Sequence, residues 1–526
     1  MKVDACKSRR SAAARLLARR FRREEDGSLV IFSLYVLLCM MLAVGMAVDT
    51  IRTEYARAKL QNVVDAAVLS AANPGQTLPA RDVVEDYLSR AGIDPDKVVI
   101  ETSTGTQSRS ASASARFDMP TIFMDMVGVN NLSVPVAGRA EQSSSELEIA
   151  LVLDNSGSMG FNGNRRMDLL KVAAKDFIDQ VLANPDAQGE VAISLIPFAT
   201  QVSAGPDILD QYDVSDEHSS SHCVDFDAKD FNSASMPNRG TLGRTAHFTI
   251  SNSMPPGEGW ICPTDESRHI TPWSGDAEQL KAKIEAMVAA GNTSIELGAK
   301  WGLAMLDPGA TDVLETLVEA GQVDEKFRGQ PFDYGTRNED GVSRMKYLII
   351  MSDGANTSQP YIKSRYRDGP STLFVHEGNF SYHDPKRPAS EQYYRFNQRS
   401  WHATPDGDGD AARLTWPEVW ETMGVFYYIT KFHVPATGEK WSDESSRILG
   451  NINNQTKNAR TSQVCREAKD AGIIVFTIGM DTYGDGDATL SDCASGEGYF
   501  YDVEGDDLGQ AFSSIARTIN HLRLTN

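Results

Sequence analysis

The sequence predicts a doubly wound α/β domain with a mostly parallel sheet, held to a membrane by one transmembrane helix. Two observations lead to this prediction. An uncharged apolar run of 20 residues lies at 29–48, and short apolar runs farther along the chain alternate with amphipathic segments. The 526 residues allow about two to four domains, and 41% hydrophobic with 23% charged residues is ordinary for a globular protein. Wholesale disorder and low-complexity designs are therefore excluded.

Charge is distributed unevenly along the chain. Residues 1–26 hold nine Lys or Arg and four Asp or Glu, whereas the whole chain has a formal net charge of −21. The acidic body lacks the basic face with which a general nucleic-acid binder meets phosphates, so no nucleic-acid partner is expected. A basic tip on an acidic body is typical of a membrane-anchored protein.

Residues 27–48 are predicted to form the transmembrane helix. Their apolar run, LVIFSLYVLLCMMLAVGMAV, would span about 30 Å as a helix, which matches the hydrocarbon thickness of a bilayer. A buried core helix remains an alternative, and so does a signal peptide cleaved near Gly45-Met46-Ala47. The arginines before the run predict that residues 1–26 form a basic cytoplasmic tail and that the rest of the chain is exported.

Residues 49–142 are expected to form a small α/β stalk region. The Ala-rich segment 49–72 continues the helix, residues 78–91 have the pattern of a second helix, and alternating runs within 96–140 predict a few strands. A polar stretch at 142–145 then marks a boundary before the next domain.

Residues 146–526 are expected to form the α/β domain. Continuous apolar runs, typical of parallel strands buried on both faces, are separated by helical patterns. These runs lie at 148–154, 191–198, 347–353 and 473–479. The alternation is interrupted by two long insertions, 204–275 and 358–460.

The second insertion is rich in aromatic residues. It holds 16 of the 43 aromatic residues of the chain, so we expect it to have its own small core. Six of them, at helix-like spacing, are expected in that core rather than on a ligand platform: Trp416, Trp420, Phe426, Tyr427, Tyr428 and Phe432.

Four cysteines lie in the exported part of the chain, which suggests two disulfides. Three pairings are possible. We favour Cys223–Cys262 and Cys465–Cys493, because the members of each pair lie within one sequence module. Four free buried thiols are the alternative.

A candidate metal site combines oxygen-bearing side chains from three motifs, of which two follow apolar runs and one opens a predicted helix. The first run ends in LVLDNSGSMG, in which Asp154, Ser156 and Ser158 alternate and therefore point the same way. The motif Gly-Asn-Thr offers Thr293, and the run YLIIMSDG places Asp353 at another carboxyl end. Hydroxyls and carboxylates suit Mg²⁺, with Ca²⁺ or Mn²⁺ as alternatives. One open position on the metal would accept a carboxylate from a partner.

These three motifs, in this order, resemble a von Willebrand factor A domain with its metal-ion-dependent adhesion site. The resemblance implies that Asp154, Ser156, Ser158, Thr293 and Asp353 bind the metal directly or through water. The two insertions depart from a minimal domain of this family.

The N-terminal sequence, EDGSLVIFSLYVLL followed by VDTIRTEYARAKLQNVVDAAVLSAA, is similar to TadG-like proteins of tight-adherence (Flp) pilus systems. The resemblance implies one anchor joined to a C-terminal A domain in the bacterial inner membrane, with the N-terminus cytoplasmic and the bulk periplasmic or surface-exposed. Phe32 stands where related prepilins carry an acid, so prepilin-type cleavage is not expected.

The function expected is a non-enzymatic, metal-dependent protein-binding module in pilus assembly or anchoring, with pilus or envelope components as partners. The alternatives are a pilus-independent surface adhesin or matrix-binding protein and, more remotely, a metal-assisted hydrolase.

Two other patterns carry less weight as metal sites. His218 and His222 have the spacing of a zinc pair, and Asp406, Asp408 and Asp410 imitate the start of a calcium loop without its turn glycine.

Overall fold

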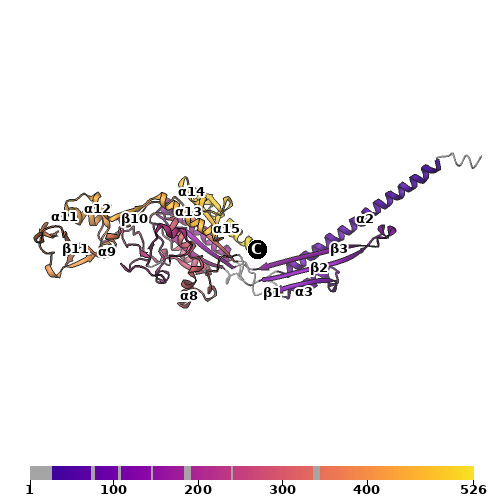
Figure 1. Ribbon diagram of the computed structural model, residues 1–526, viewed down its shortest axis with the longest axis horizontal. Coiled ribbons are helices and arrows are strands. Elements are labelled where there is room, and N and C mark those ends of the chain that lie inside the picture. Colours follow the sequence, from indigo (N-terminus) through magenta and orange to yellow (C-terminus); the bar gives the residue numbers. More distant parts are fainter. Residues whose placement is uncertain are drawn as a thin grey trace, which may run out of the picture. The chain divides into compact units, whose positions relative to one another are not determined.

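The computed structural model describes residues 26–72, 78–104, 108–143, 146–182, 191–237, 241–335 and 344–525 (Figure 1). The chain divides into two compact units, Met1–Ser143 and Ser144–Asn526. Residues 1–25 of the expected basic tail lie outside the described residues, as do the boundary residues 144 and 145.

The first unit begins with one uninterrupted helix, α2 (Asp26–Ala71). Among the described helices, it is the one long and apolar enough to cross a membrane, and its apolar window is only 6% buried. The exposed apolar surface excludes the alternative of a buried core helix. The helix continues without a break to Ala71, as expected for the segment 49–72.

The C-terminal part of α2 packs on the rest of the first unit. Helix α3 (Ala80–Arg90) precedes three antiparallel strands in the order β1-β2-β3. The strands are β1 (Val98–Thr104), β2 (Ser108–Pro120) and β3 (Asn131–Ser143). Buried apolar residues of α2, α3 and the three strands share one core, which includes Val64, Val68, Leu88, Ala111 and Val136.

A six-stranded sheet in the order β18-β17-β9-β4-β5-β8 forms the centre of the second unit. Five strands are parallel, and β8 lies antiparallel to β5 at one edge. The bounds are β4 (Glu146–Asp154), β5 (Val191–Phe198), β8 (Thr271–Ser274), β9 (Arg344–Ser352), β17 (Ile474–Met480) and β18 (Phe500–Val503). The predicted doubly wound, von Willebrand factor A-like fold is confirmed. Because β8 belongs to the sheet, the first insertion ends before Thr271 rather than at residue 275.

Helices cover both faces of this sheet. Alternate residues of β4 enter two separate cores, with Leu151 and Leu153 on one face and Ala150 and Val152 on the other. The first face is covered by α4 (Phe161–Leu182), α6 (Ala277–Glu285) and α15 (Leu508–Thr525). The second is covered by α7 (Ile295–Ala304), α8 (Thr311–Glu319), α13 (Asn454–Asp470) and α14 (Asp485–Cys493).

Helix α7 lies unusually close to the sheet. A Cβ atom on Gly298 would come within 2.8 Å of Phe198 and Val152, and one on Gly302 within 2.6 Å of Val152. Such distances are too short for non-bonded atoms, so the two glycines allow the helix backbone to rest on the strands. This contact fixes the position of the loop before α7, which carries Thr293.

Parts of the two insertions share one hydrophobic core, whereas other residues of the first insertion pack against the central sheet. The second contributes Trp420, Tyr428 and Ile429, and the first contributes Phe248 and Ile261. The backbone N–H of Val425 also donates to the carbonyl oxygen of Thr249. The expected core of the second insertion is therefore confirmed, and it extends into the first.

The second insertion combines a sheet of its own with short helices. Its five-stranded sheet has the order β14-β13-β12-β11-β15, and β10 pairs with β16. These strands are β10 (Gln359–Ile362), β11 (Pro370–His376), β12 (Asn379–His383), β13 (Tyr393–Arg395), β14 (Ser400–His402), β15 (Ala412–Thr415) and β16 (Leu449–Ile452). The helices are α9 (Trp416–Thr422), α10 (Val425–Tyr428), α11 (Val434–Thr437) and α12 (Trp441–Ile448). The first insertion contains α5 (Pro206–Leu209), β6 (Val224–Asp225) and β7 (Gly243–Arg244).

Both favoured disulfides are present. Cys223 pairs with Cys262 inside the first insertion, and Cys465 of α13 pairs with Cys493 of α14. Cys39 on α2 is free and exposed.

Candidate metal centre

The five predicted metal-binding residues lie in three loops, two of which follow neighbouring strands, while the third precedes helix α7. Asp154 ends β4, and Asp353 follows β9, which pairs with β4 in parallel. Ser156 and Ser158 belong to the turn after β4, and Thr293 precedes α7. Because parallel strands end at the same edge, both carboxylates lie at one end of the sheet.

Hydrogen bonds connect four of the five side chains. Thr293 Oγ1 donates to Ser156 Oγ at 3.0 Å, and the hydroxyl oxygens of Ser156 and Ser158 are 3.1 Å apart. Ser158 Oγ then donates to Asp353 Oδ1 at 2.7 Å. The fifth residue, Asp154, accepts from the backbone N–H of Ser156 at 2.7 Å. Residues from three separate loops thus place their oxygens together.

The site is buried except at one residue. Asp154, Ser156, Thr293 and Asp353 are each at most 4% exposed, whereas Ser158 is half-buried. Burial, followed by the charge of Asp353, raises the pKa of Asp154 to about 7, although the hydroxyl of Ser352 donates to it. The buried carboxylates of Asp154 and Asp353 are shielded from solvent and therefore repel each other when both are ionised. A divalent cation between them would relieve that repulsion.

Arg166 on α4 is a member of the site that the sequence did not reveal. Its Nη1 donates to Asp353 Oδ2 at 2.8 Å, and its Nε donates to Asp481 Oδ2 at 3.1 Å. Asp481 follows β17 and also accepts from the backbone N–H of Gly505. The guanidinium therefore links the ends of β9 and β17 and holds one oxygen of Asp353. No local pattern distinguishes Arg166 from the other arginines of the chain.

A tight turn positions Thr293. Gly291 has φ of +93°, and its carbonyl oxygen accepts from the backbone N–H of Gly157 at 2.9 Å. A Cβ atom at Gly291 would lie 2.8 Å from Thr200 Oγ1, so only glycine fits there. Thr200 Oγ1 in turn accepts from the backbone N–H of Asn292 at 2.7 Å. The turn joins the end of β5 to the turn after β4 that carries Ser156 and Ser158, which we call the serine loop.

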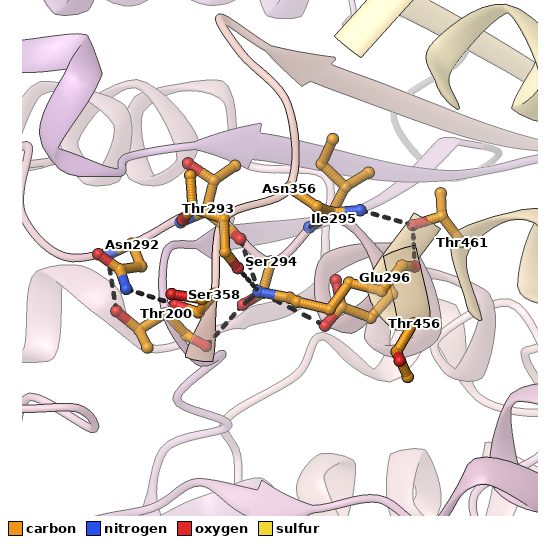
Figure 2. Close-up of polar contacts among 12 residues, drawn as sticks. Thr200, Asn292, Thr293, Ser294, Ile295, Glu296, Asn356, Ser358, Thr456 and Thr461 are labelled. Carbon is orange, nitrogen blue, oxygen red and sulfur yellow. Dashed lines mark hydrogen bonds and ion pairs between the residues drawn. The ribbon is translucent and has the colours of Figure 1, made fainter. Parts of the chain in front are cut away.

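The buried side chain of Lys457 supports the same turn through hydrogen bonds. Its Nζ donates to the carbonyl oxygens of Thr293 and Thr357 at 2.7 and 2.8 Å, and to Ser294 Oγ at 2.6 Å. It also lies 3.7 Å from a carboxylate oxygen of Glu296, and both side chains are 0% exposed. Figure 2 shows Thr293, Ser294 and Glu296 around this network. Lys457 lies in the range expected to be insertion, so sequence reasoning missed it.

Asn356 joins the loop after β9 to the start of α7. Its Oδ1 accepts from the backbone N–H of Ile295 at 2.7 Å, and its Nδ2 donates to Thr461 Oγ1 at 3.2 Å (Figure 2). Thr357 Oγ1 accepts from the backbone N–H of Thr293 at 2.8 Å. The loops that carry Asp353 and Thr293 are therefore fastened to each other and to α13.

The residues present fit a hard divalent cation. The donor set consists of three hydroxyls and two carboxylates, and it contains no nitrogen or sulfur ligand. Four of these oxygen donors are connected through contacts of 2.7–3.1 Å. This chemistry suits Mg²⁺, Mn²⁺ or Ca²⁺ better than zinc.

Neither of the two candidate clusters that contain histidine has the oxygen-only donor set of the predicted metal site. His218 and His222 lie outside helices and face different rings, those of His247 and His269. A further group, His433, Glu439 and Glu444, has ligand atoms within 4.8 Å of one another. Arg447 pairs with both of its carboxylates.

Two of the three calcium-like aspartates, Asp406 and Asp408, are held by side chains of the second insertion. Asp408 Oδ1 accepts from Arg395 Nη2 at 3.0 Å, and Asp406 Oδ2 accepts from Asn397 at 3.0 Å. Their carboxylates are thus satisfied without an ion.

Residues 27–73 match the family model described as putative Flp pilus-assembly TadE/G-like. The N-terminal segment is TadE/G-like. With the apolar surface of α2, this match identifies the protein as membrane-anchored. The expected TadG-like arrangement is an anchor segment followed by a von Willebrand factor A-like domain. The TadE/G-like match and the strand order of the sheet together confirm it. A search of curated proteins gave no significant match.

Solved structures with related architecture include domains of pilus proteins. The vWF domain of the type V pili tip protein Mfa5 from Porphyromonas gingivalis is 15% identical, with a TM-score of 0.32 over 73% of this chain and 98% of that one. The pilus adhesin SpaC from Lactobacillus rhamnosus GG is 12% identical, with a TM-score of 0.31 over 81% and 35%. The PilB minor pilin from Streptococcus sanguinis is 13% identical, with a TM-score of 0.30 over 80% and 77%. Because these TM-scores are low, the fold assignment rests on the strand order.

Proposed function

We propose that the protein is a non-enzymatic, membrane-anchored adhesion module that binds a protein partner through a divalent cation during assembly or anchoring of a Flp-type pilus. The observation that carries the proposal is the hydrogen-bonded series Thr293–Ser156–Ser158–Asp353, which ends beside Asp154. The TadE/G-like N-terminal segment supports the pilus context. In this proposal the anchor lies in the inner membrane, with the N-terminus cytoplasmic and the second unit periplasmic or surface-exposed.

The five side chains would hold Mg²⁺, with Mn²⁺ or Ca²⁺ as substitutes. When bound, the cation would supply an open coordination position for a carboxylate of the partner protein. Ser158 is the half-buried member of the set, so the partner would approach past it. Arg166 keeps one oxygen of Asp353 engaged and so orients that carboxylate toward Ser158.

The loops around the site offer a contact surface for that partner. Phe161, which follows the serine loop, is 62% exposed, and Tyr483, in the loop after β17, is 83% exposed. Exposed aromatic side chains are enriched in protein interfaces, where they provide much of the binding energy. The second insertion also begins in the loop after Asp353, so it would contribute to partner choice.

A divalent-cation-dependent pull-down from envelope extract tests this function. Full-length protein would be compared with Asp353→Ala, with chelator present and absent. The matched control is Asp502→Ala, because Asp502 is an exposed carboxylate on edge strand β18. We expect an envelope or pilus component to be captured by wild type and Asp502→Ala only, and only with Mg²⁺. Capture that ignores both chelator and Asp353→Ala would refute the proposal.

A further inference from the structure

The connection between β2 and β3 in the first unit exposes an apolar surface. This connection, residues 121–130, has the sequence TIFMDMVGVN. Ile122, Met126 and Val127 are 57%, 75% and 53% exposed. Asp125 is the only charged residue between positions 119 and 138. A solvent-facing loop usually carries polar side chains, so this composition needs an explanation.

Asp49 of α2 fastens the connection to the anchor helix. Its carboxylate accepts hydrogen bonds from the backbone N–H groups of Ile122, Phe123 and Met124, the shortest at 2.7 Å. Asp49 is 2% exposed, although it lies on a helix whose neighbouring residues face outward. Three N–H donors on one carboxylate are the strong, charge-assisted kind of hydrogen bond. The loop is therefore held at a defined height along α2.

Gly45, one turn before Asp49 on α2, allows the loop to approach the helix closely. Gly45 is buried, and a Cβ atom placed on it would lie 2.6 Å from Phe123 Cβ. It precedes Val48, the end of the uncharged run, by three residues, or about 4.5 Å along the helix axis. Phe123 therefore contacts α2 at a level that belongs to the membrane span.

We propose that residues 121–130 dock into the bilayer interface beside the anchor helix, with phospholipid as their partner. The apolar surface of the connection is continuous with the exposed apolar surface of α2, which anchors the protein in the membrane. Apolar side chains with few charges favour the boundary between headgroups and acyl chains. The first unit would then be attached at two points, by a spanning helix and by an interfacial loop.

Lipid-dependent quenching of a fluorescent label tests this proposal in the full chain. Cys6→Ser and Cys39→Ser would be introduced so that the label reacts only at the chosen position. The protein would then be reconstituted in nanodiscs of phosphatidylethanolamine and phosphatidylglycerol. An NBD group on Met126→Cys or Val127→Cys should show blue-shifted emission and be quenched by brominated acyl chains. The control is Val99→Cys, because Val99 is 63% exposed on β1 of the same unit. It should show neither effect.

Two outcomes would overturn the proposal. Water-like emission at both loop positions, equal to that at Val99, would place the loop in solvent. Blue-shifted emission without quenching by brominated lipid would indicate a protein partner, such as a second copy of the chain, instead of lipid.

A further variant, Gly45→Leu, tests the contact between the loop and α2. The larger side chain should displace Phe123 and weaken the quenching at Met126, while the helix still anchors the protein. Undiminished quenching in that variant would show that the contact between Gly45 and Phe123 does not hold the loop at the membrane.

Discussion

Ser158 and Asp353 are 195 positions apart in the sequence, yet the hydroxyl of Ser158 donates a hydrogen bond of 2.7 Å to the carboxylate of Asp353. The contact joins the loop after β4 to the loop after β9, at the edge where these parallel strands end. Asp154 lies on the same edge and is fully buried. Two carboxylates enclosed among hydroxyls form an arrangement that a small divalent cation would stabilise.

Mg²⁺ should raise the melting temperature of the second unit in the wild type. A ligand that binds only the native state stabilises it by about 2.7 kcal/mol at a concentration of 100 times Kd. Asp353→Asn should remove most of this increase, because it takes away a charge that the cation needs. Differential scanning calorimetry with and without Mg²⁺ measures the effect. An equal increase in wild type and Asp353→Asn would place the stabilising cation elsewhere.

Lys457→Met should destabilise the protein by about 3–5 kcal/mol, because it leaves the buried carboxylate of Glu296 without its partner. It also removes the hydrogen bonds to the carbonyl oxygens of Thr293 and Thr357, so Mg²⁺ affinity should fall as well. Urea unfolding and Mg²⁺ titration measure the two effects separately.

The double variant Glu296→Gln with Lys457→Met provides the matched comparison. It should recover part of the stability, since neither position then carries a buried charge. It should not recover the Mg²⁺ affinity, since the turn of Thr293 stays unsupported. If Lys457→Met alone were as stable as the wild type, the role assigned to this lysine would be wrong.

Tyr483→Ala and Phe161→Ala should weaken partner capture without changing Mg²⁺ affinity. Both side chains are mostly exposed, so their loss should change the free energy of unfolding by no more than about 0.5 kcal/mol. Pull-down yield and Mn²⁺ titration on the same samples separate the two effects. Val172→Ala on α4, where Val172 is 58% exposed, is the control for the loss of exposed apolar surface. Unchanged capture in both aromatic variants would exclude these residues from the interface.

Much of this architecture could be predicted from the sequence, because the central strands are continuous apolar runs and the disulfide partners lie within single modules. The edge strands β8 and β18 could not, since each has only four residues. The five oxygen donors stand in recognisable motifs, four of them at or just after the end of a strand and Thr293 just before helix α7. Arg166 and Lys457 do not, because they lie on helices and meet the site only through the tertiary fold. The same holds for Asp49 and its contact with the β2–β3 connection.

Acid should destabilise the first insertion through its buried histidines. Burial, followed by the charge of His218, lowers the pKa of His247 to about 4, against the opposing effects of Glu421 and a backbone hydrogen bond at Cys262. The unfolded chain therefore takes up a proton below about pH 6.5, while the native state stays neutral until about pH 4. The stability from this histidine is complete above pH 6.5 and is lost as the pH falls toward 4, by about 1–3 kcal/mol.

His247→Phe tests this pH dependence, because phenylalanine keeps the stacking on Trp260 but does not titrate. Urea unfolding at pH 7 and pH 4.5 should show a smaller loss of stability in the variant than in the wild type. Burial also lowers the pKa values of His218, His222 and His269, so part of the acid sensitivity should remain. Identical pH profiles would show that His247 is not buried in its neutral form.

Mn²⁺ titration of the full-length protein, followed by electron paramagnetic resonance, tests the central claim most directly. The wild type and Asp502→Ala should bind one Mn²⁺ ion that Mg²⁺ displaces, and Asp353→Asn and Ser156→Ala should each bind it at least about tenfold more weakly. If the wild type bound no Mn²⁺, or if these two variants bound it as tightly as the wild type does, the oxygen cluster around Ser158 and Asp353 would not be a metal centre.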